Sequence, residues 1–282
     1  MTNCRAYVLF ALWGLIAVLL AMVPMSCSVK ESREECPTYL SLSIRTDELP
    51  EGNVGILGWD NGVLFRDNIA SSELSSYFIR TVSKGSFYVS AYAGGKAALS
   101  DSHYVWVPSG CQADSLYGFY TRVNTTEEDA HADVDFHKQF CTVHLSIGRS
   151  AEQMKDFRFR VTGNTSGFDM LNFKALPGAY SYVPEHIPGE DEVTFRILRQ
   201  VDSSMSLEVF RCMPDGETRS DIGDGFLSAG EFPLGKYIER TGYDWEAVEL
   251  DDVYVTIGFA LEYVTVGVGD WEEGTTFGFI EQ

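Results

Sequence analysis

Cys27 is the residue whose surroundings point most clearly to a chemical reaction. It follows Val23-Pro24-Met25-Ser26, so that a small residue directly precedes the cysteine, as a lipoprotein signal peptidase requires. The Cys27 thiol would carry a thioether-linked diacylglycerol, and the amino group exposed by cleavage would then be acylated. Pro24 and Met25 depart from the commonest form of this motif, which has Leu and Ala there. The position of Cys27 at the end of an apolar run nevertheless predicts that it is lipidated.

The segment before Cys27 has the pattern of a secretory signal. Arg5 is its only charged side chain, and the run from Ala6 to Met25 is almost wholly apolar or small. A basic start followed by an apolar stretch is typical of a signal peptide, although about 20 apolar residues could also stay as a transmembrane helix. We expect a lipoprotein signal peptide at 1–26 and a lipidated, charged tether at 27–36. An uncleaved anchor helix and plain secretion are the alternatives.

Four further cysteines remain once Cys4 leaves with the signal and Cys27 is lipidated. Outside the cytoplasm they could form disulfides, with three possible full pairings, and the sequence does not choose among them. None lies in a C-x-x-C motif or has metal-ligand spacing. One of them, Cys141, lies in an apolar run and could simply be a small buried side chain. The four are Cys36, Cys111, Cys141 and Cys212.

The remaining candidates for chemistry predict no active site. No nucleophile elbow, P-loop, zinc-protease motif or dinucleotide fingerprint occurs in the sequence. Asp224, Gly225 and Glu231 match three positions of a calcium loop, but Ile222 stands where a carboxylate is needed. We expect no catalytic residues, no cofactor and no metal, and therefore not an enzyme. The five histidines show no catalytic spacing: His103, His131, His137, His144 and His186.

The charge of the chain narrows the possible partners. The formal net charge is −20, with 21 basic against 41 acidic side chains. Phosphate binding needs clustered Lys and Arg, so we expect no nucleic-acid partner. The same acidity argues against adhesion to anionic lipid. Adjacent carboxylates such as Asp251 and Asp252 are expected to be solvated surface groups.

The elements that carry these residues are predicted to be short strands. Residues 39–44 alternate apolar and polar, the period of a half-buried strand. Asp60-Asn61-Gly62 separates two such runs, 54–59 and 63–65, and Asn-Gly suits a tight hairpin turn. Only 151–155 and 236–245 suggest helix. Further strands are expected at 77–82, 87–93, 103–107, 117–123, 134–136, 140–147, 157–161, 179–183, 193–198, 205–210, 253–259 and 264–268, with a turn at 162–167.

This pattern of many strands and few helices predicts an all-β chain. The number of expected strands suits two β-sandwiches better than one. The polar, acidic stretch 124–133 is the best candidate for a linker between them. We expect an N-terminal β-sandwich at 37–132 and a C-terminal β-sandwich at 133–282.

Three stretches together carry a resemblance to a known family. They are the mature start Cys27–Pro37 with the strand that follows it, the segment Phe232–Ile238 with Gly242–Trp245, and the final hairpin closed by Asp270-Trp271. The chain resembles the FimB-like fimbrillin anchor family, lipoproteins at the base of type V pili. The resemblance implies two tandem transthyretin-like β-sandwiches and a structural subunit held at the outer membrane.

Within that family, the resemblance implies that the protein attaches fimbriae to the outer membrane and limits their length. It implies fimbrial (pilin) subunits as partners, through strand addition, in which one protein lends a strand to the sheet of another. Whether this chain donates or accepts the strand stays open. The acids after Cys27 resemble an export signal to the outer face, although Ser32 and Arg33 interrupt them.

The aromatic content supports one alternative function. The chain has 18 Phe, 14 Tyr and 5 Trp, and exposed aromatic rings can bind glycans. A surface lipoprotein that binds glycans is therefore the second hypothesis, with Trp106 and Trp271 as its test positions. A secreted enzyme or inhibitor is a third. Against the glycan hypothesis, Trp59, Trp106, Trp245 and Trp271 are scattered along the sequence.

Overall fold

The computed structural model describes most of the mature chain. The described residues are 36–45, 49–74, 77–94, 103–108, 110–148, 150–187, 189–213, 219–220, 223–258, 261, 263–269 and 275–278. The predicted signal peptide, Cys27 and most of the tether lie outside them. Within the described ranges, no helix combines the length and the apolar character needed to cross a membrane.

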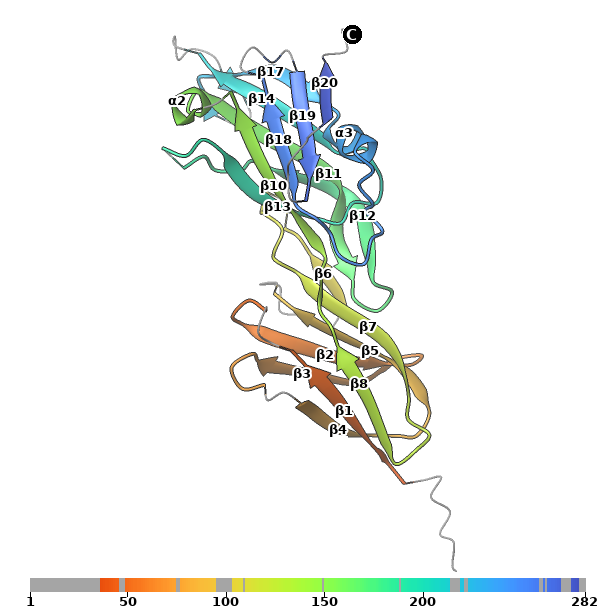
Figure 1. Cartoon of the computed structure of the whole chain (residues 1–282). Helices are drawn as coiled ribbons and strands as arrows, with labels where there is room; N and C mark the ends of the chain where they lie inside the picture. Colours follow the sequence, from red (N-terminus) through yellow and green to blue (C-terminus); the bar gives the residue numbers. More distant parts are fainter. Residues whose placement is uncertain are drawn as a thin grey trace, which may run out of the picture. The chain divides into compact units, whose positions relative to one another are not determined.

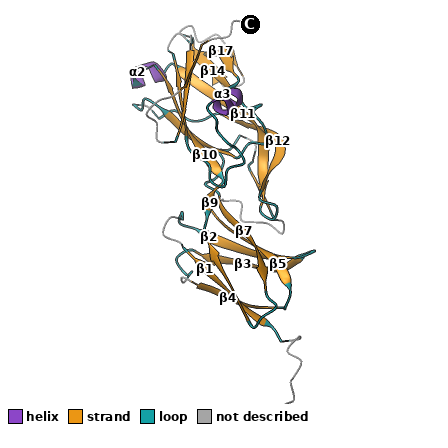
Figure 2. Cartoon of the chain, turned by 45° about the vertical axis from the view of Figure 1, so that its right-hand side comes forward, coloured by secondary structure: helices purple, strands orange, loops and turns teal. Residues whose placement is uncertain are grey.

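Strands make up most of the described chain, which confirms the all-β prediction. Figure 1 traces the strands in sequence colours, and Figure 2 shows how little helix accompanies them. The elements are β1 Thr38–Ile44, β2 Asn53–Trp59, β3 Val63–Ala70, β4 Tyr77–Val82, β5 Ser86–Ala93, β6 Tyr104–Trp106, β7 Tyr117–Asn124, β8 Asp129–Val134, β9 His137–Lys138, β10 Phe140–Ile147, α2 Ala151–Met154, β11 Phe157–Asp169, β12 Lys174–Tyr182, β13 Val193–Leu198, β14 Ser206–Cys212, β15 Arg219–Ser220, β16 Gly223–Asp224, β17 Phe226–Phe232, α3 Leu234–Arg240, β18 Val253–Ile257, β19 Tyr263–Val268 and β20 Thr275–Gly278.

The first sandwich has one sheet in the order β4-β1-β8 and another in the order β3-β2-β5-β7-β9. Burial alternates along β1, where Leu40, Leu42 and Ile44 are buried and the residues between them are not. Such a period of two places one face of a strand in the core. At the predicted hairpin between β2 and β3, Asn61 has φ 48°, a left-handed conformation that Asn tolerates better than most residues.

The second sandwich has one sheet in the order β13-β10-β18-β19-β20 and another in the order β12-β11-β14-β17. Its core is larger and rich in aromatic and branched side chains, with Phe157, Phe159 and Phe195 all at most 1% exposed. Burying each such ring stabilises the fold by roughly 1.5–3 kcal/mol relative to leaving it in water. The two inner faces therefore account for the alternation seen in the sequence.

Strand β6 crosses from the first set of strands to the second. In the chain it lies between β5 and β7 of the first sandwich, but it pairs antiparallel with β11 of the second, with Val105 opposite Phe168 and Trp106 opposite Gly167. A third apolar cluster forms around this pairing and includes Val105, Phe140 and Phe168. The predicted division of the chain at residues 132/133 stays a prediction.

The structure corrects several expected segments, and of the expected strand 134–136 only Val134 lies in a strand, at the end of β8. Residues 129–133 of the expected linker belong to β8, in which Ala130 and Val134 are buried and the acidic residues are exposed. The expected turn at 162–167 continues β11, whose ladder with β12 passes through two bulges. The expected helix 236–245 is α3, Leu234–Arg240, and it ends just before Gly242, whose φ of 86° stops the helix.

Candidate functional site

Two edge strands of the first sandwich, β3 and β4, form the candidate site. Each ends its sheet: β3 lies beside β2 alone, and β4 lies beside β1 alone, in the sheet orders of the described strands. An edge strand presents backbone N–H and C=O groups that a further strand can pair with. The two edges belong to opposite sheets and are linked by side-chain contacts, so together they form one border of the sandwich.

A cavity of about 350 Å³ lies at this border. Both edge strands and the turn that follows β4 contribute to its wall, and its apolar part is made by Leu64, Phe65, Val82 and Phe87. Phe65 and Phe87 meet edge to face with their ring centroids 6.1 Å apart. The other lining residues are Asp60, Arg80, Thr81, Ser83, Lys84, Gly85 and Ser86.

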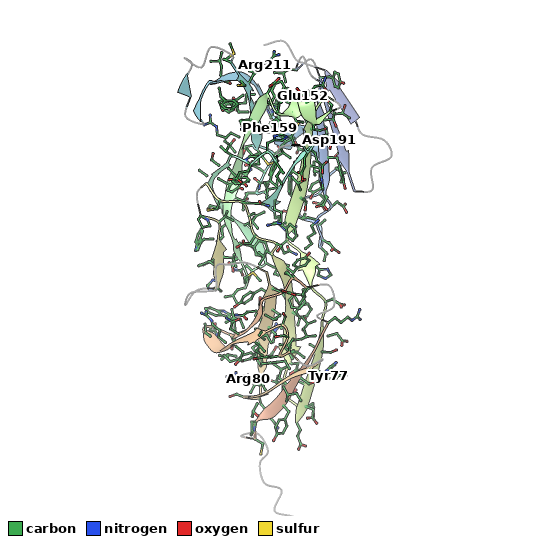
Figure 3. The ribbon with its side chains drawn as sticks, turned by 90° about the vertical axis from the view of Figure 1, so that its left-hand side faces the viewer. Tyr77, Arg80, Glu152, Phe159, Asp191 and Arg211 are labelled. Carbon is green, nitrogen blue, oxygen red and sulfur yellow. The ribbon has the colours of Figure 1, made fainter. Side chains whose placement is uncertain are left out.

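A charged pair bridges the two edge strands. Arg80 lies between Phe78 and Val82 on the face of β4 that turns to the core, and its guanidinium Nη1 contacts Asp67 Oδ2 of β3. The guanidinium carbon also lies 4.7 Å from the centroid of the Phe65 ring. Figure 3 labels Arg80 and Tyr77, both on β4.

This pair is the feature that the sequence reasoning missed. The side chains of Arg80 and Asp67 are 36% and 27% exposed, so the pair is neither buried nor freely solvated. The signal was present in the strand pattern: in the run Phe78 to Val82 every second residue turns inward, and the middle one is an arginine. Its partner could not be found, because nothing in the sequence says that β3 and β4 share a border.

Other sheet edges in the second sandwich are partly covered by the segment that follows β6. The Ala113 N–H donates to the carbonyl of Arg196 on β13 at 3.3 Å, and Arg196 Nε donates to the Ala113 carbonyl at 3.2 Å. The Gly110 N–H donates to the carbonyl of Ser181 on β12 at 3.1 Å. These bonds occupy groups on β12 and β13 that an added strand would need, so these two edges are weaker candidates than the β3–β4 border.

The cysteines are free thiols. Cys36, Cys111 and Cys212 are exposed and Cys141 is buried, so the structure contains no disulfide among the four. Burial raises the pKa of the Cys141 thiol to about 12, which keeps it protonated and unreactive. The lipidation site Cys27 lies outside the described residues and stays a prediction.

Asp252, one of the two adjacent acidic residues expected to be solvated, has specific partners in the structure. Asp252 Oδ1 accepts bonds from Lys138 Nζ at 2.5 Å and from the Thr142 N–H at 2.7 Å. Burial alone would raise the pKa of the Asp252 carboxyl, but these bonds and the Lys138 charge lower it below its usual range. Asp252 is therefore a structural anion that ties the start of β18 to β9 and β10.

The histidines and the calcium-loop match give no metal centre in the part of the chain that is described. No three His, Cys, Asp or Glu side chains gather there in a way that could hold an ion. His144 Nδ1 lies 3.0 Å from Glu192, and His103 Nε2 lies 3.8 Å from Asp169. Glu231 lies on β17 opposite Glu208, and Ile222 lies outside the described residues.

Comparison with solved structures shows which proteins have a similar fold. No family model and no curated protein sequence matches the chain. A candidate polysaccharide-binding protein from Bacteroides thetaiotaomicron matches 88% of this chain and 99% of its own, with TM-score 0.60 and 12% identity. A candidate adhesin from Bacteroides ovatus matches 91% of this chain and 100% of its own, with TM-score 0.56 and 13% identity.

A third similar structure is the fimbrial anchor protein Mfa2 from Porphyromonas gingivalis. It matches over 84% of this chain and 98% of its own, with TM-score 0.52 and 11% identity. None of the three is described as an enzyme. The chain thus shares its all-β fold, over most of its length, with an adhesin-like protein, with a candidate polysaccharide binder and with a fimbrial anchor.

Proposed function

We propose that this chain is a lipid-anchored structural subunit that attaches fimbriae to the outer membrane, limits their length and serves cell adhesion. The observation that carries the proposal is the match of nearly the whole chain to a fimbrial anchor protein, in a chain whose sequence places a lipidation motif at Cys27. Two or more acyl chains hold a protein durably on a membrane. The protein would then lie at the base of the fimbrium, exposed on the cell surface.

The partner in this proposal is a fimbrial subunit that adds a strand at the β3–β4 border. Strand addition gains affinity from main-chain bonds and specificity from pockets that take alternate side chains of the added strand. The border supplies both requirements: two sheet edges for the main chain and the adjoining cavity for side chains. In this arrangement the chain accepts the strand, and the Arg80–Asp67 pair lies where the added strand would enter.

Fractionation of cells tests the lipid part of the proposal. We expect Cys27→Ala to leave the membrane fraction, while Cys36→Ala, nine positions further on, fractionates like the natural protein. The natural protein should also gain the mass of a diacylglycerol and an acyl chain on its first mature residue. Unchanged fractionation of Cys27→Ala would show that a lipid on Cys27 does not hold the protein on the membrane.

Binding of fimbrial subunits tests the strand site. Leu64 lies on β3, lines the cavity and is 53% exposed, so Leu64→Lys should put a charge where an apolar side chain of the added strand must fit. The matched control is Leu227→Lys on β17, another edge strand, where Leu227 is 49% exposed. Co-purified fimbrial subunits should fall roughly tenfold for Leu64→Lys, a loss of about 1.4 kcal/mol, and stay unchanged for the control. Equal co-purification in the two variants would exclude this border.

A further inference from the structure

Trp106 on β6 has the placement of a binding residue. It is 50% exposed, which is unusual for the largest apolar side chain in a chain with a well-packed core. A Cβ built on Gly167 would lie 2.8 Å from Trp106 Cε3 and 3.3 Å from Cδ2. The indole therefore rests against the bare backbone of Gly167, which fixes the ring in place and leaves much of it open to solvent.

Tyr104 continues this surface along the same strand. Residues two apart on a strand share a face, and the ring centroids of Tyr104 and Trp106 are 5.9 Å apart. The tyrosine ring is itself held by His103, whose ring centroid lies 4.1 Å away. Two aromatic rings, whose planes are inclined to each other by 52°, are thus presented on one face of the paired strands β6 and β11.

The neighbouring strands add polar groups beside the rings. Across β6, β11 and β12, Trp106 is in register with Gly167 and Leu176. Two residues along, Tyr104 is in register with Asp169 and Lys174. Lys174 is exposed and Leu176 is half-buried. Asn172, also exposed, is positioned by its bond from Nδ2 to Asp169 Oδ2 at 2.7 Å.

We propose that Trp106 and Tyr104 form a stacking platform for a neutral polysaccharide. The C–H face of a pyranose ring packs on an aromatic face, and its hydroxyl groups need donors and acceptors at the edge of the platform, such as Lys174 and Asn172. Binding sites of this type combine apolar and aromatic surface with a few placed polar groups. Neighbouring sugar residues of one chain would lie on the two rings.

The charge of the protein decides which ligand suits the platform. Bases of single-stranded nucleic acid also stack on aromatic rings, but they need a positively charged groove, and this chain has a formal net charge of −20. Acidic polysaccharides are repelled for the same reason. A neutral glycan is not repelled by the negative charge of the protein, so we assign the platform to a neutral glycan.

Affinity electrophoresis of the full chain in detergent tests the platform. The gels contain one neutral polysaccharide each, from a panel of mannan, xylan, β-glucan and starch, with polygalacturonate as the acidic probe. We expect retardation by at least one neutral polysaccharide, insensitive to added salt, and none by polygalacturonate. Trp106→Ala should weaken that retardation roughly tenfold, the loss of one aromatic anchor worth about 1.4 kcal/mol, and Trp106→Phe should retain part of it.

The matched control is Tyr39→Ala, which removes a ring on β1 that is 56% exposed and lies outside the platform. It should migrate like the natural protein, and circular dichroism should show all three variants folded. Absence of retardation by every neutral polysaccharide would overturn the proposal, as would equal retardation of Trp106→Ala and the natural protein. Attachment of fimbriae should be unchanged in Trp106→Ala. The two assays therefore test the glycan platform and the anchor function independently.

Discussion

The Arg80–Asp67 pair offers a test of how the β3–β4 border is held together. Arg80→Ala removes three contributions at once: the ion pair with Asp67, the cation–π contact with Phe65 and the packing of the arginine stem. The side chains are 36% and 27% exposed, so solvent screens the ion pair, and we assign it only about 0.5–1 kcal/mol. The cation–π contact adds about 0.5–1 kcal/mol. We expect Arg80→Ala to destabilise the fold by roughly 1–2 kcal/mol.

A double-mutant cycle measures the energy of the Arg80–Asp67 ion pair separately from the cation–π contact and the packing of the arginine stem. Urea unfolding of the natural protein, Arg80→Ala, Asp67→Ala and the double variant should give a coupling energy of about 0.5–1 kcal/mol between the two positions. The coupling should shrink in 1 M salt, because salt screens a partly exposed pair. A control cycle on Lys155 and Glu152, whose side chains are 53% and 79% exposed, should give less. A coupling energy of zero between Arg80 and Asp67 would refute the idea that their contact ties β3 to β4.

Three further predictions concern stability and reactivity. Gly55→Ala should destabilise the first sandwich by roughly 1–3 kcal/mol in urea unfolding, because its Cβ would lie 1.7 Å from Cζ of the buried Tyr92 ring; unchanged stability would show that the ring can move aside freely. The lowered pKa of Asp252 means that its contribution is present above its unfolded pKa of about 3.9 and is lost as pH falls through its folded pKa. Asp252→Asn should therefore be less stable than the natural protein at pH 7 and nearly equal to it at low pH, and a constant difference across pH would contradict that role. Cys141, with its pKa raised to about 12 by burial, should resist thiol reagents until the protein unfolds, whereas the exposed Cys111 should react in the native state; equal rates would argue against the buried placement.

The fold was predictable where alternation was strong. The runs 77–82, 140–147 and 193–198 form β4, β10 and β13 at those bounds, because burial on one face imposes the period of two directly on the sequence. The alternation was harder to recognise in β8, because this strand is rich in acidic residues. These residues lie on its outer face, while Ala130 and Val134 turn inward. Turn-forming residues misled in β11, where Gly163 and Gly167 belong to bulges and to a close approach by β6 rather than to a turn.

The candidate sites were less predictable than the strands. Trp106 is a test position of the glycan hypothesis, because exposed aromatic rings can bind glycans. Its platform depends on Gly167, which lies 61 positions away, and on a pairing of β6 with β11 that no local pattern announces. The same holds for Arg80 and Asp67, which are close in sequence but lie on edges of different sheets. Both sets of contacts depend on which strands are neighbours in the fold, and a single sequence does not show that directly.

The central claim is that this chain ties fimbriae to a membrane through the lipid on Cys27, and one measurement tests it most directly. Cells that lack the chain are complemented with the natural gene or with Cys27→Ala, and fimbriae on cells and in the medium are counted and measured by electron microscopy. We expect attached fimbriae of limited length with the natural gene, and fimbriae shed into the medium with Cys27→Ala. Fimbriae that stay attached at normal length in the Cys27→Ala cells would contradict it.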